Sequence, residues 1–399
     1  MNTPEPLTPK RAWVPFAYGF RPFFLLSGLY AVVAIALWVA TWPGGRFAIA
    51  GAPAMFWHGH EMVFGFIGAA IAGFMLTAVP SWTGQRGFAG RPLMLLVFLW
   101  LAGRAVFLAG DAVPFALLAV AELAFLPGVV AMVGPSLART ANRNRPLIIV
   151  LSAFWLLDAA FLYGLGTGNP LVCMIALRGA IGGVLVLITV IGGRIVPAFT
   201  GNALRAAGVE ATLRSPAGLG RATIGATLAW AIAAAFSPLG VWAALLAAVA
   251  AALHLARMAG WQGWRTGRMP IVWILHLAYA WLPVGLALHA VFIATGAPWA
   301  AHWLHALGAG AAGMMILAVM TRAALGHTGR PLRVSGAIVV AYSLLLVAVL
   351  VRVFAAVIPG LAYPTAIHLA GGLWVLSFGL FVITYTPVLL LPRVDGKPG

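Results

Sequence analysis

The sequence predicts an all-α, polytopic integral membrane protein of about twelve transmembrane helices, and three observations support this fold class. Of the 399 residues, 63% are hydrophobic and only 8% are charged, and the mean hydropathy is +1.03. A soluble domain would carry charge on roughly a quarter of its residues, so most of the surface must face a lipid bilayer. The apolar runs are about as long as a membrane-crossing helix, and they are continuous rather than alternating, which excludes a β-barrel.

Twelve apolar segments are predicted to cross the membrane. In chain order they cover residues 23–41, 58–80, 92–110, 113–134, 147–166, 170–196, 221–236, 238–259, 270–295, 299–322, 335–358 and 362–391. The seventh segment is short, and only the turn at Ser237–Pro238 separates it from the eighth, so a merger of these two would change the helix count. The predicted organisation is a cytoplasmic segment at 1–22, one transmembrane domain at 23–391 and a cytoplasmic tail at 392–399.

The distribution of basic residues predicts that both ends of the chain are cytoplasmic. With the N-terminus inside, the inner segments hold 20 of the 24 Lys and Arg residues, whereas the outer loops hold only Arg46. This asymmetry follows the positive-inside rule. The remaining three, Arg104, Arg178 and Arg352, lie inside helices. The net charge of +17 does not indicate nucleic acid as a partner, because the basic residues are scattered between apolar runs and form no stripe.

Nine histidines are the main chemical resource of the chain. In the predicted topology six of them lie near the outer ends of their helices: His58, His60, His289, His302, His305 and His368. The other three lie in the inner half: His254, His276 and His327. A single intramembrane histidine is more often a packing residue than a ligand, so the hypothesis of a functional site depends on this clustering. Neutral imidazole binds copper, iron and zinc, and it is a common axial ligand of haem.

Local spacing suggests how these side chains are grouped. His302 and His305 are three residues apart and share a helix face, as do His58 and Glu61, whereas His60 is expected to point away from both of its neighbours. Cys173 is the only cysteine, so no thiolate cluster is expected. With seven acidic residues in the whole chain, a calcium or magnesium site rich in carboxylates is not expected either.

The three intramembrane arginines fall in the outer third of their helices, at the depth of the six histidines. A buried arginine needs an anionic partner, and the acids expected nearby are Glu61, Asp111 and Asp158. Haem propionates would supply such carboxylates. The alternative is that each of the arginines Arg104, Arg178 and Arg352 extends to the lipid headgroups.

Four stretches of the chain carry recognisable motifs. They are F-x-Y-G-F-R-P-F-F at 16–24, W-H-G-H-E-M-V-F-G at 57–65 leading into G-F-M-L-T-A-V-P-S-W-T-G at 73–84, G-G-R-I-V-P-A-F-T-G-N at 192–202, and the segment 305–330, which begins H-A-L-G-A-G and ends T-R-A-A-L-G-H-T-G-R. Together with a closing Y-T-P-V-L-L-L-P-R-V-D-G, they resemble the NnrS family, haem- and copper-containing membrane proteins linked to nitric oxide metabolism.

The resemblance implies haem b, copper, and a role in handling nitric oxide during nitrosative stress or denitrification in a bacterial inner membrane. It leaves open whether nitric oxide is reduced or only bound, sensed or buffered, and it does not identify the electron donor. The cofactor-binding residues expected from the shared outer layer are His58, His60, His289, His302, His305, His368, Arg104, Arg178 and Arg352, and His58, His60 and His305 also lie in the matching motifs. Of these, His58, His60, His302 and His305 are expected to bind metal, with His276 and His327 as second-tier candidates. Glu61, next to the expected ligands, is a candidate proton relay.

One alternative from another functional class remains open at this point. Twelve spans with cytoplasmic ends are also typical of secondary transporters, whose substrate sites lie near the membrane midplane at broken helices. Pro283, inside the ninth predicted span, could mark such a break. The concentration of polar residues near one face, rather than at the midplane, favours the haem hypothesis.

Overall fold

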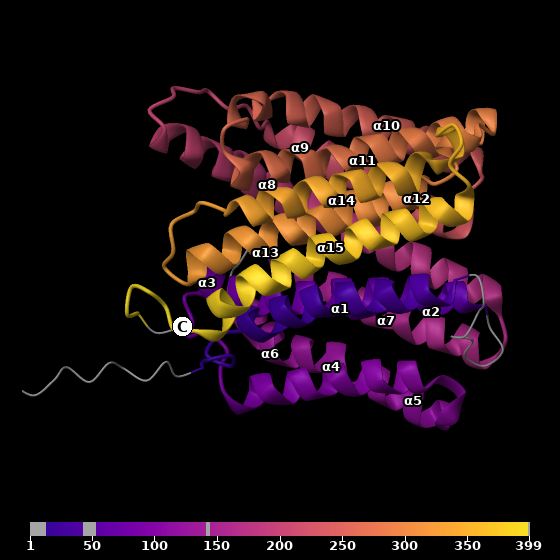
Figure 1. Cartoon of the computed structure of the whole chain (residues 1–399), viewed down its shortest axis with the longest axis horizontal. Helices are drawn as coiled ribbons and strands as arrows, with labels where there is room; N and C mark the ends of the chain where they lie inside the picture. Colours follow the sequence, from indigo (N-terminus) through magenta and orange to yellow (C-terminus); the bar gives the residue numbers. More distant parts are fainter. Residues whose placement is uncertain (1–12, 43–52, 141–143, 398–399) are drawn as a thin grey trace, which may run out of the picture.

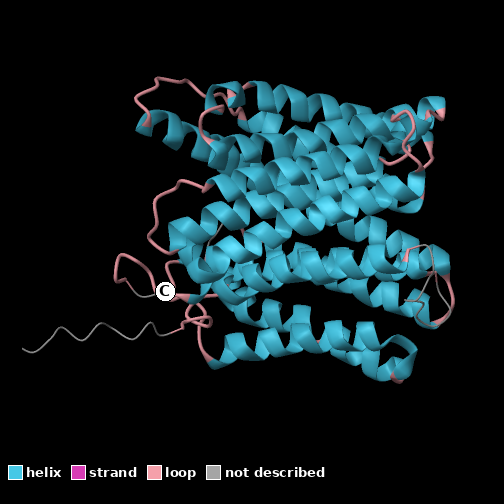
Figure 2. Cartoon of the chain, viewed as in Figure 1, coloured by secondary structure: helices cyan, strands magenta, loops and turns pink. Residues whose placement is uncertain are grey.

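The structure, a computed structural model, describes residues 13–42, 53–140 and 144–397, and these residues form helices and loops without any strand (Figure 2). Twelve helical spans are long and apolar enough to cross a membrane, which confirms the predicted fold class. The protein is therefore a multi-pass membrane protein. Lys10, Arg11, Arg46 and Arg143, which contribute to the charge asymmetry, lie outside the described residues.

The spans consist of the following helices. The first six are built from α1 (Phe20–Thr41), α2 (Ala54–His60) continuing through η1 (Glu61–Ile67) into α3 (Gly68–Thr83), α4 (Arg91–Ala109), α5 (Phe115–Leu123) with α6 (Phe125–Arg139), α7 (Leu147–Gly166) and α8 (Pro170–Ala206). The last six are built from α9 (Ala217–Phe236), α10 (Val241–Ala259), α11 (Pro270–Thr295), α12 (Trp303–His305) continuing through η5 (Ala306–Gly313) into α13 (Met314–His327), α14 (Gly336–Phe354) and α15 (Tyr363–Leu390).

The predicted spans match these helices, with differences at the ends. The seventh and eighth spans are separate helices, α9 and α10, so the turn at Ser237–Pro238 is confirmed. The sixth span was predicted to end at residue 196, but α8 continues to Ala206. The apolar pattern marks only the part of a helix that lies in lipid, and it does not reveal a polar extension beyond it.

The fourth span is interrupted at Ala124, between α5 and α6. Pro127 has no N–H to donate to the carbonyl of Leu123, four residues earlier, and its ring would collide with that carbonyl in a regular helix. The Leu123 carbonyl instead accepts a hydrogen bond from the indole of Trp155 on α7, at 3.0 Å. This interruption places Glu122 in the last turn of α5, beside the break.

Two π-helical segments, η1 and η5, interrupt the second and tenth spans. Each begins directly after a histidine, His60 in one span and His305 in the other. In η1, the carbonyls of Gly65 and Phe66 accept hydrogen bonds from the side chains of Trp100 and Ser27, both at 3.1 Å. Segments with i→i+5 hydrogen bonds are rare and are frequent at functional sites. The apolar pattern of the sequence does not predict them.

The first and last helices lie side by side, and the two described ends of the chain meet at one end of the bundle (Figure 1). The N–H of Val14 donates to the carbonyl of Leu390 at 2.8 Å. The buried guanidinium of Arg21 donates to the carbonyls of Leu389 and Leu391 at 2.9 and 2.8 Å. We call this end of the bundle, with residues 13–21 and 391–397, the terminal face, and the opposite end the far face. The charge asymmetry predicts that the terminal face is cytoplasmic.

The C-terminal residues close this face by binding the end of α13. Arg393 donates to the carbonyl of His327 at 2.6 Å and holds the carboxylate of Asp395 with two further hydrogen bonds. These bonds lower the pKa of Asp395 to about 2. Gly329 has a φ of 72°, and a Cβ there would lie 2.6 Å from the carboxyl carbon of Asp395. On the other side, the ring of Tyr18 stacks on His327. Three of the sequence motifs therefore meet at the terminal face.

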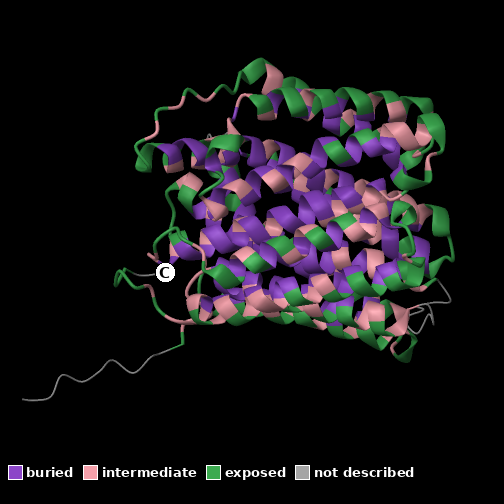
Figure 3. Cartoon of the chain, turned by 45° about the horizontal axis from the view of Figure 1, so that its top comes forward, coloured by how far each residue is buried: buried purple, intermediate pink, exposed green. Residues whose placement is uncertain are grey.

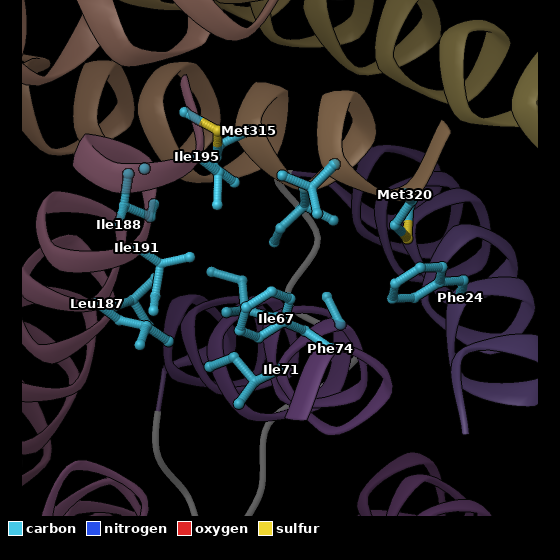
Figure 4. Close-up of a pocket in the computed structure, with 15 residues that line it drawn as sticks. Phe24, Ile67, Ile71, Phe74, Leu187, Ile188, Ile191, Ile195, Met315 and Met320 are labelled. Carbon is cyan, nitrogen blue, oxygen red and sulfur yellow. The ribbon is translucent and has the colours of Figure 1, made fainter. Parts of the chain in front are cut away.

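Buried residues gather in the middle of the bundle, and exposed apolar residues lie on its periphery (Figure 3). The second, ninth and tenth spans are the most enclosed. Between α1, α3, α8 and α13 lies an apolar cavity of about 80 Å³ (Figure 4). Ile67 and Ile71 line it on one side, Ile188 and Met315 on others, and its lining contains no charged side chain. The cavity thus lies where the two halves of the chain meet.

Candidate functional site

The six histidines predicted to share one layer lie on helix ends at the far face. They lie on α2, the last two turns of α11, the start of the tenth span and the start of α15. Figure 1 shows α2 and α12 at the end of the bundle opposite the C-terminus. The structure nevertheless divides these six histidines among four different environments, and only three of them lie together.

The first environment is a cluster of five buried charged or polar side chains, which we call the charged cluster: His60, Glu61, Arg104, Glu122 and Asp158. The two ring nitrogens of His60 lie 2.8 Å from Glu61 Oε1 and 3.0 Å from Asp158 Oδ1. Glu122 Oε1 lies 3.7 Å from His60 Nε2. Arg104 donates to Glu61 Oε1 at 2.5 Å and, through its other terminal nitrogen, to Glu122 Oε1. The cluster thus joins η1, α4, α5 and α7.

Aromatic rings enclose the charged cluster. Phe107 stacks on the His60 ring with centroids 3.9 Å apart and planes 3° from parallel. This stacking fixes the plane of the His60 ring, whose two nitrogens contact Glu61 and Asp158. Two glycines make room for the charges. A Cβ at Gly65 would lie 2.8 Å from a guanidinium nitrogen of Arg104, and one at Gly103 would lie 2.6 Å from Glu122 Oε2.

One geometric expectation was wrong here, and another was confirmed for Glu61 but incomplete. The ring of His60 does not point away from Glu61 but lies within hydrogen-bond distance of it. The prediction assumed a regular helix, whereas the π-helical segment begins at Glu61 and changes the direction in which that side chain leaves the backbone. The anionic partners of Arg104 are Glu61 and Glu122, and Glu122 was not among the acids expected nearby.

The second environment, which we call the imidazole group, consists of His58, His302 and His305 around the guanidinium of Arg352. His305 lies within range of electrostatic interaction with His58, His302 and Arg352. His302 Nε2 lies 3.3 Å from the hydroxyl of Tyr363. The group joins α2 in the first half of the chain to α12 and α14 in the second half.

Two rings of the imidazole group have free nitrogens. Among the described residues, no hydrogen bond reaches the ring nitrogens of His58 or His305. Both residues are half-buried, and His58 is oriented by stacking on Trp38 with centroids 4.6 Å apart. Within the described structure, Arg352 Nη1 is buried and has no hydrogen-bond partner. Two free imidazoles and an incompletely bound guanidinium therefore face the same region.

The remaining two histidines of the far face do not join either group. His289 uses both ring nitrogens, accepting from the indole of Trp230 at 3.0 Å and donating to the carbonyl of Pro238 at 2.8 Å. Its ring also stacks on Trp303, at 3.6 Å between centroids. His368 is exposed on α15 and bonds to the carbonyl of Pro364 in its own helix, at 2.7 Å. Arg178, half-buried on α8, lies within electrostatic range of His289.

The three histidines near the terminal face are engaged with protein groups. His254 lies 3.1 Å from the hydroxyl of Thr227 and 3.0 Å from that of Tyr279. His276 Nε2 lies 2.7 Å from the hydroxyl of Thr200. His254 and His276 therefore hold helices together at this depth, whereas His327, at the end of α13, stacks on Tyr18 in the segment before α1.

Sequence reasoning missed Glu122 as a site residue and named Asp158 only as a neighbour of the arginines. A signal for both was present, because each is a carboxylate inside an otherwise apolar span. With Glu61 they are three of the seven acidic residues of the whole chain. Such a concentration of scarce charges in three different spans indicates that the spans bring them together.

The fold and the two groups at the far face define a class: a multi-pass helical membrane protein with imidazole, carboxylate and guanidinium groups buried near one end of the bundle. The model of one family, described as NnrS protein, matches residues 14–393, nearly the whole chain. The chain belongs to the NnrS family. No curated protein matches it.

Proposed function

We propose that this protein binds haem through His58 and His305 and that it handles nitric oxide in a bacterial inner membrane. The observation that carries the proposal is the pair of half-buried imidazoles without a hydrogen bond in the described structure, beside the orphaned Nη1 of Arg352. Imidazole is a usual axial ligand of haem iron, and a buried guanidinium pairs well with a carboxylate such as a propionate. When bound, haem would supply a redox-active iron that binds nitric oxide.

The distribution of polar groups supports the choice of these two histidines. His60 and His289 each have both ring nitrogens in contact with protein acceptors or donors, and His368 is exposed. His58 and His305 come from the two spans that contain π-helical segments, so both ligands are held by irregular, enclosed helices. His302, the third member of the group, is available for copper or for a propionate.

The apolar cavity supports a small, uncharged substrate. Its lining is formed by α3 and α13, the same two spans that carry His58 and His305 nearer the far face, and by α1 and α8. Nitric oxide is a small, uncharged molecule, and a lining without charged groups would not oppose its passage from the bilayer. The substrate therefore reaches the imidazole group from within the membrane in this proposal.

The transporter alternative is not supported by the residue on which it depended. Pro283 lies inside α11, which runs without interruption from Pro270 to Thr295. Irregular backbone occurs instead in the second and tenth spans, next to His60 and His305, and at the break of the fourth span beside Glu122.

The test of the proposed function is optical. The full-length protein, purified from haem-replete cells, is expected to show a Soret band and a reduced-minus-oxidised spectrum of b-type haem that changes when nitric oxide is added. Iron and copper are measured in the same sample. A folded protein without a Soret band, or with one that does not respond to nitric oxide, would contradict the proposal.

Arg352→Gln is expected to weaken haem binding and to lower its midpoint potential, because a positive charge beside the iron is removed. A hydrogen bond to a charged group contributes about 1.5–3 kcal/mol, which corresponds to a tenfold or greater loss of haem affinity. Haem content and redox titration measure both effects. Arg178→Gln is the matched control and is expected to leave both unchanged, because Arg178 is within electrostatic range of His289 and is not among the charged groups that act on His305. Equal behaviour of the two variants would remove Arg352 from the site.

A further inference from the structure

We propose that His60, Glu122 and Asp158 form a binding site for one divalent metal ion. This site is separate from the imidazole group and does not depend on haem binding. His60 is close to His58 in sequence, but its ring lies in the charged cluster with residues of α4, α5 and α7. The three proposed ligands are 0%, 4% and 2% exposed.

The spacing of the three donor atoms fits one ion. One ligand atom from each residue lies within 4.8 Å of the others. His60 Nε2 is 3.0 Å from Asp158 Oδ1 and 3.7 Å from Glu122 Oε1. Ligands about 2.1 Å from a common ion are separated by roughly 3.0 Å in octahedral and 3.4 Å in tetrahedral geometry. The two distances from His60 Nε2 therefore need little adjustment to become edges of a coordination polyhedron.

The hydrogen bond of His60 to Glu61 prepares the other ring nitrogen for a cation. An ionised carboxylate can only accept, so His60 Nδ1 must donate its proton to Glu61 Oε1 across 2.8 Å. A neutral ring then presents the lone pair of Nε2 to Asp158 Oδ1, which is also an acceptor. Two lone pairs 3.0 Å apart repel each other unless a proton or a metal cation lies between them. This carboxylate–histidine arrangement is the usual support of metal-bound imidazole.

Charge balance supports an ion with two positive charges. Three carboxylates contribute −3 and Arg104 contributes +1, so the cluster has a net charge of −2 when His60 is neutral. A buried net charge of this size is very costly without compensation. In addition, Glu61 Oε2 and Glu122 Oε2 are buried and have no hydrogen-bond partner in the described structure. One divalent cation neutralises the cluster, and as a ligand to that ion the Glu122 carboxylate gains a partner that its Oε2 lacks.

The donor set identifies the class of ion. One imidazole nitrogen and two or more carboxylate oxygens suit Zn²⁺, Mn²⁺ or Fe²⁺, whereas Cu⁺ prefers the thiolate and thioether ligands that this cluster lacks. Arg104 would remain as the partner of Glu61, and Glu61 as the support of His60. The four helices that supply the cluster would then be joined through one ion.

The experiment uses the full-length protein in detergent, with metal analysis and haem absorbance measured on each sample. The wild type is expected to contain about one non-haem divalent ion per chain and, after chelation, to rebind one Mn²⁺ with imidazole nitrogen coupling in its electron spin echo spectrum. Asp158→Asn and Glu122→Gln are expected to weaken Mn²⁺ binding by at least about tenfold, with haem content unchanged. Glu210→Gln, an exposed acid outside the cluster, is the control and should bind Mn²⁺ as the wild type does.

Three results would overturn the proposal: no ion and no Mn²⁺ binding in the wild type, Mn²⁺ without nitrogen coupling, or full Mn²⁺ binding in both folded cluster variants. The first result would mean that two protons neutralise the cluster instead. The wild-type spectrum tests the proposal even if the variants fail to fold. His58→Ala separates the two proposals, because it should lose haem and retain the ion.

Discussion

His305→Ala and His58→Ala are each expected to lose most of the haem, with at least a tenfold fall in haem per protein. Each variant removes one imidazole whose ring nitrogens make no hydrogen bond among the described residues, so no protein hydrogen bond is lost with the proposed ligand. Haem is measured by its Soret absorbance and pyridine haemochrome, at equal protein yield. The two variants should behave alike, because each removes one of the two imidazoles proposed to bind the haem.

Two other histidine substitutions serve as controls for this result. His368→Ala changes an exposed histidine at the same end of the bundle and should leave the spectrum intact. His327→Ala changes a histidine 22 residues after His305, roughly 33 Å along a helix, so the two cannot bind one iron. Spectral loss of the same size in His327→Ala as in His305→Ala, with folding confirmed, would contradict the assignment of the haem to the imidazole group.

Arg104→Met is expected to have the largest effect on stability. It leaves Glu61 and Glu122 without their cationic partner in an aromatic enclosure. Removal of one partner of a buried ion pair costs about 3–5 kcal/mol, which is a large part of the stability of a typical protein. We expect a strongly lowered unfolding midpoint in detergent and a low yield of folded protein.

A double variant distinguishes lost charge balance from lost packing. Arg104→Met combined with Glu122→Gln removes one positive and one negative charge, and it should recover part of the stability that Arg104→Met loses. Arg178→Met, which changes the half-buried arginine of α8, should cost less than about 1 kcal/mol. If the double variant is less stable than Arg104→Met alone, Arg104 stabilises the fold by packing and not by its charge.

The sequence predicted the twelve spans because continuous apolar runs report burial in lipid directly. It also predicted that six histidines lie towards one end of the bundle, since depth follows from counting residues along alternating helices. It could not predict which of them meet. That depends on the rotation of each helix about its axis, and in lipid the apolar pattern is similar on all sides of a helix, so it leaves this rotation undefined.

Particular residues show where that limit lies. His60 was expected to point away from Glu61, yet the two side chains are hydrogen-bonded, because the π-helical segment that begins at Glu61 changes the direction in which that side chain leaves the backbone. Glu122 reaches Arg104 from a helix that Pro127 interrupts, and the partner of the carbonyl left without a bond is Trp155 on another span. Both features depend on contacts between helices distant in sequence.

The closure of the terminal face has a consequence for how the protein is made. Arg21, in α1, bonds to carbonyls at the end of α15, which is synthesised much later. Arg393 then binds the C-terminal residues to the end of α13 through its hydrogen bond to the carbonyl of His327. The contact between α1 and α15 can form only after α15 has been inserted. Until then, the side of α1 that packs against α15 remains without its partner in the bilayer. Chains that stop before α15 would expose this side of α1, and they would be ready substrates for membrane quality control.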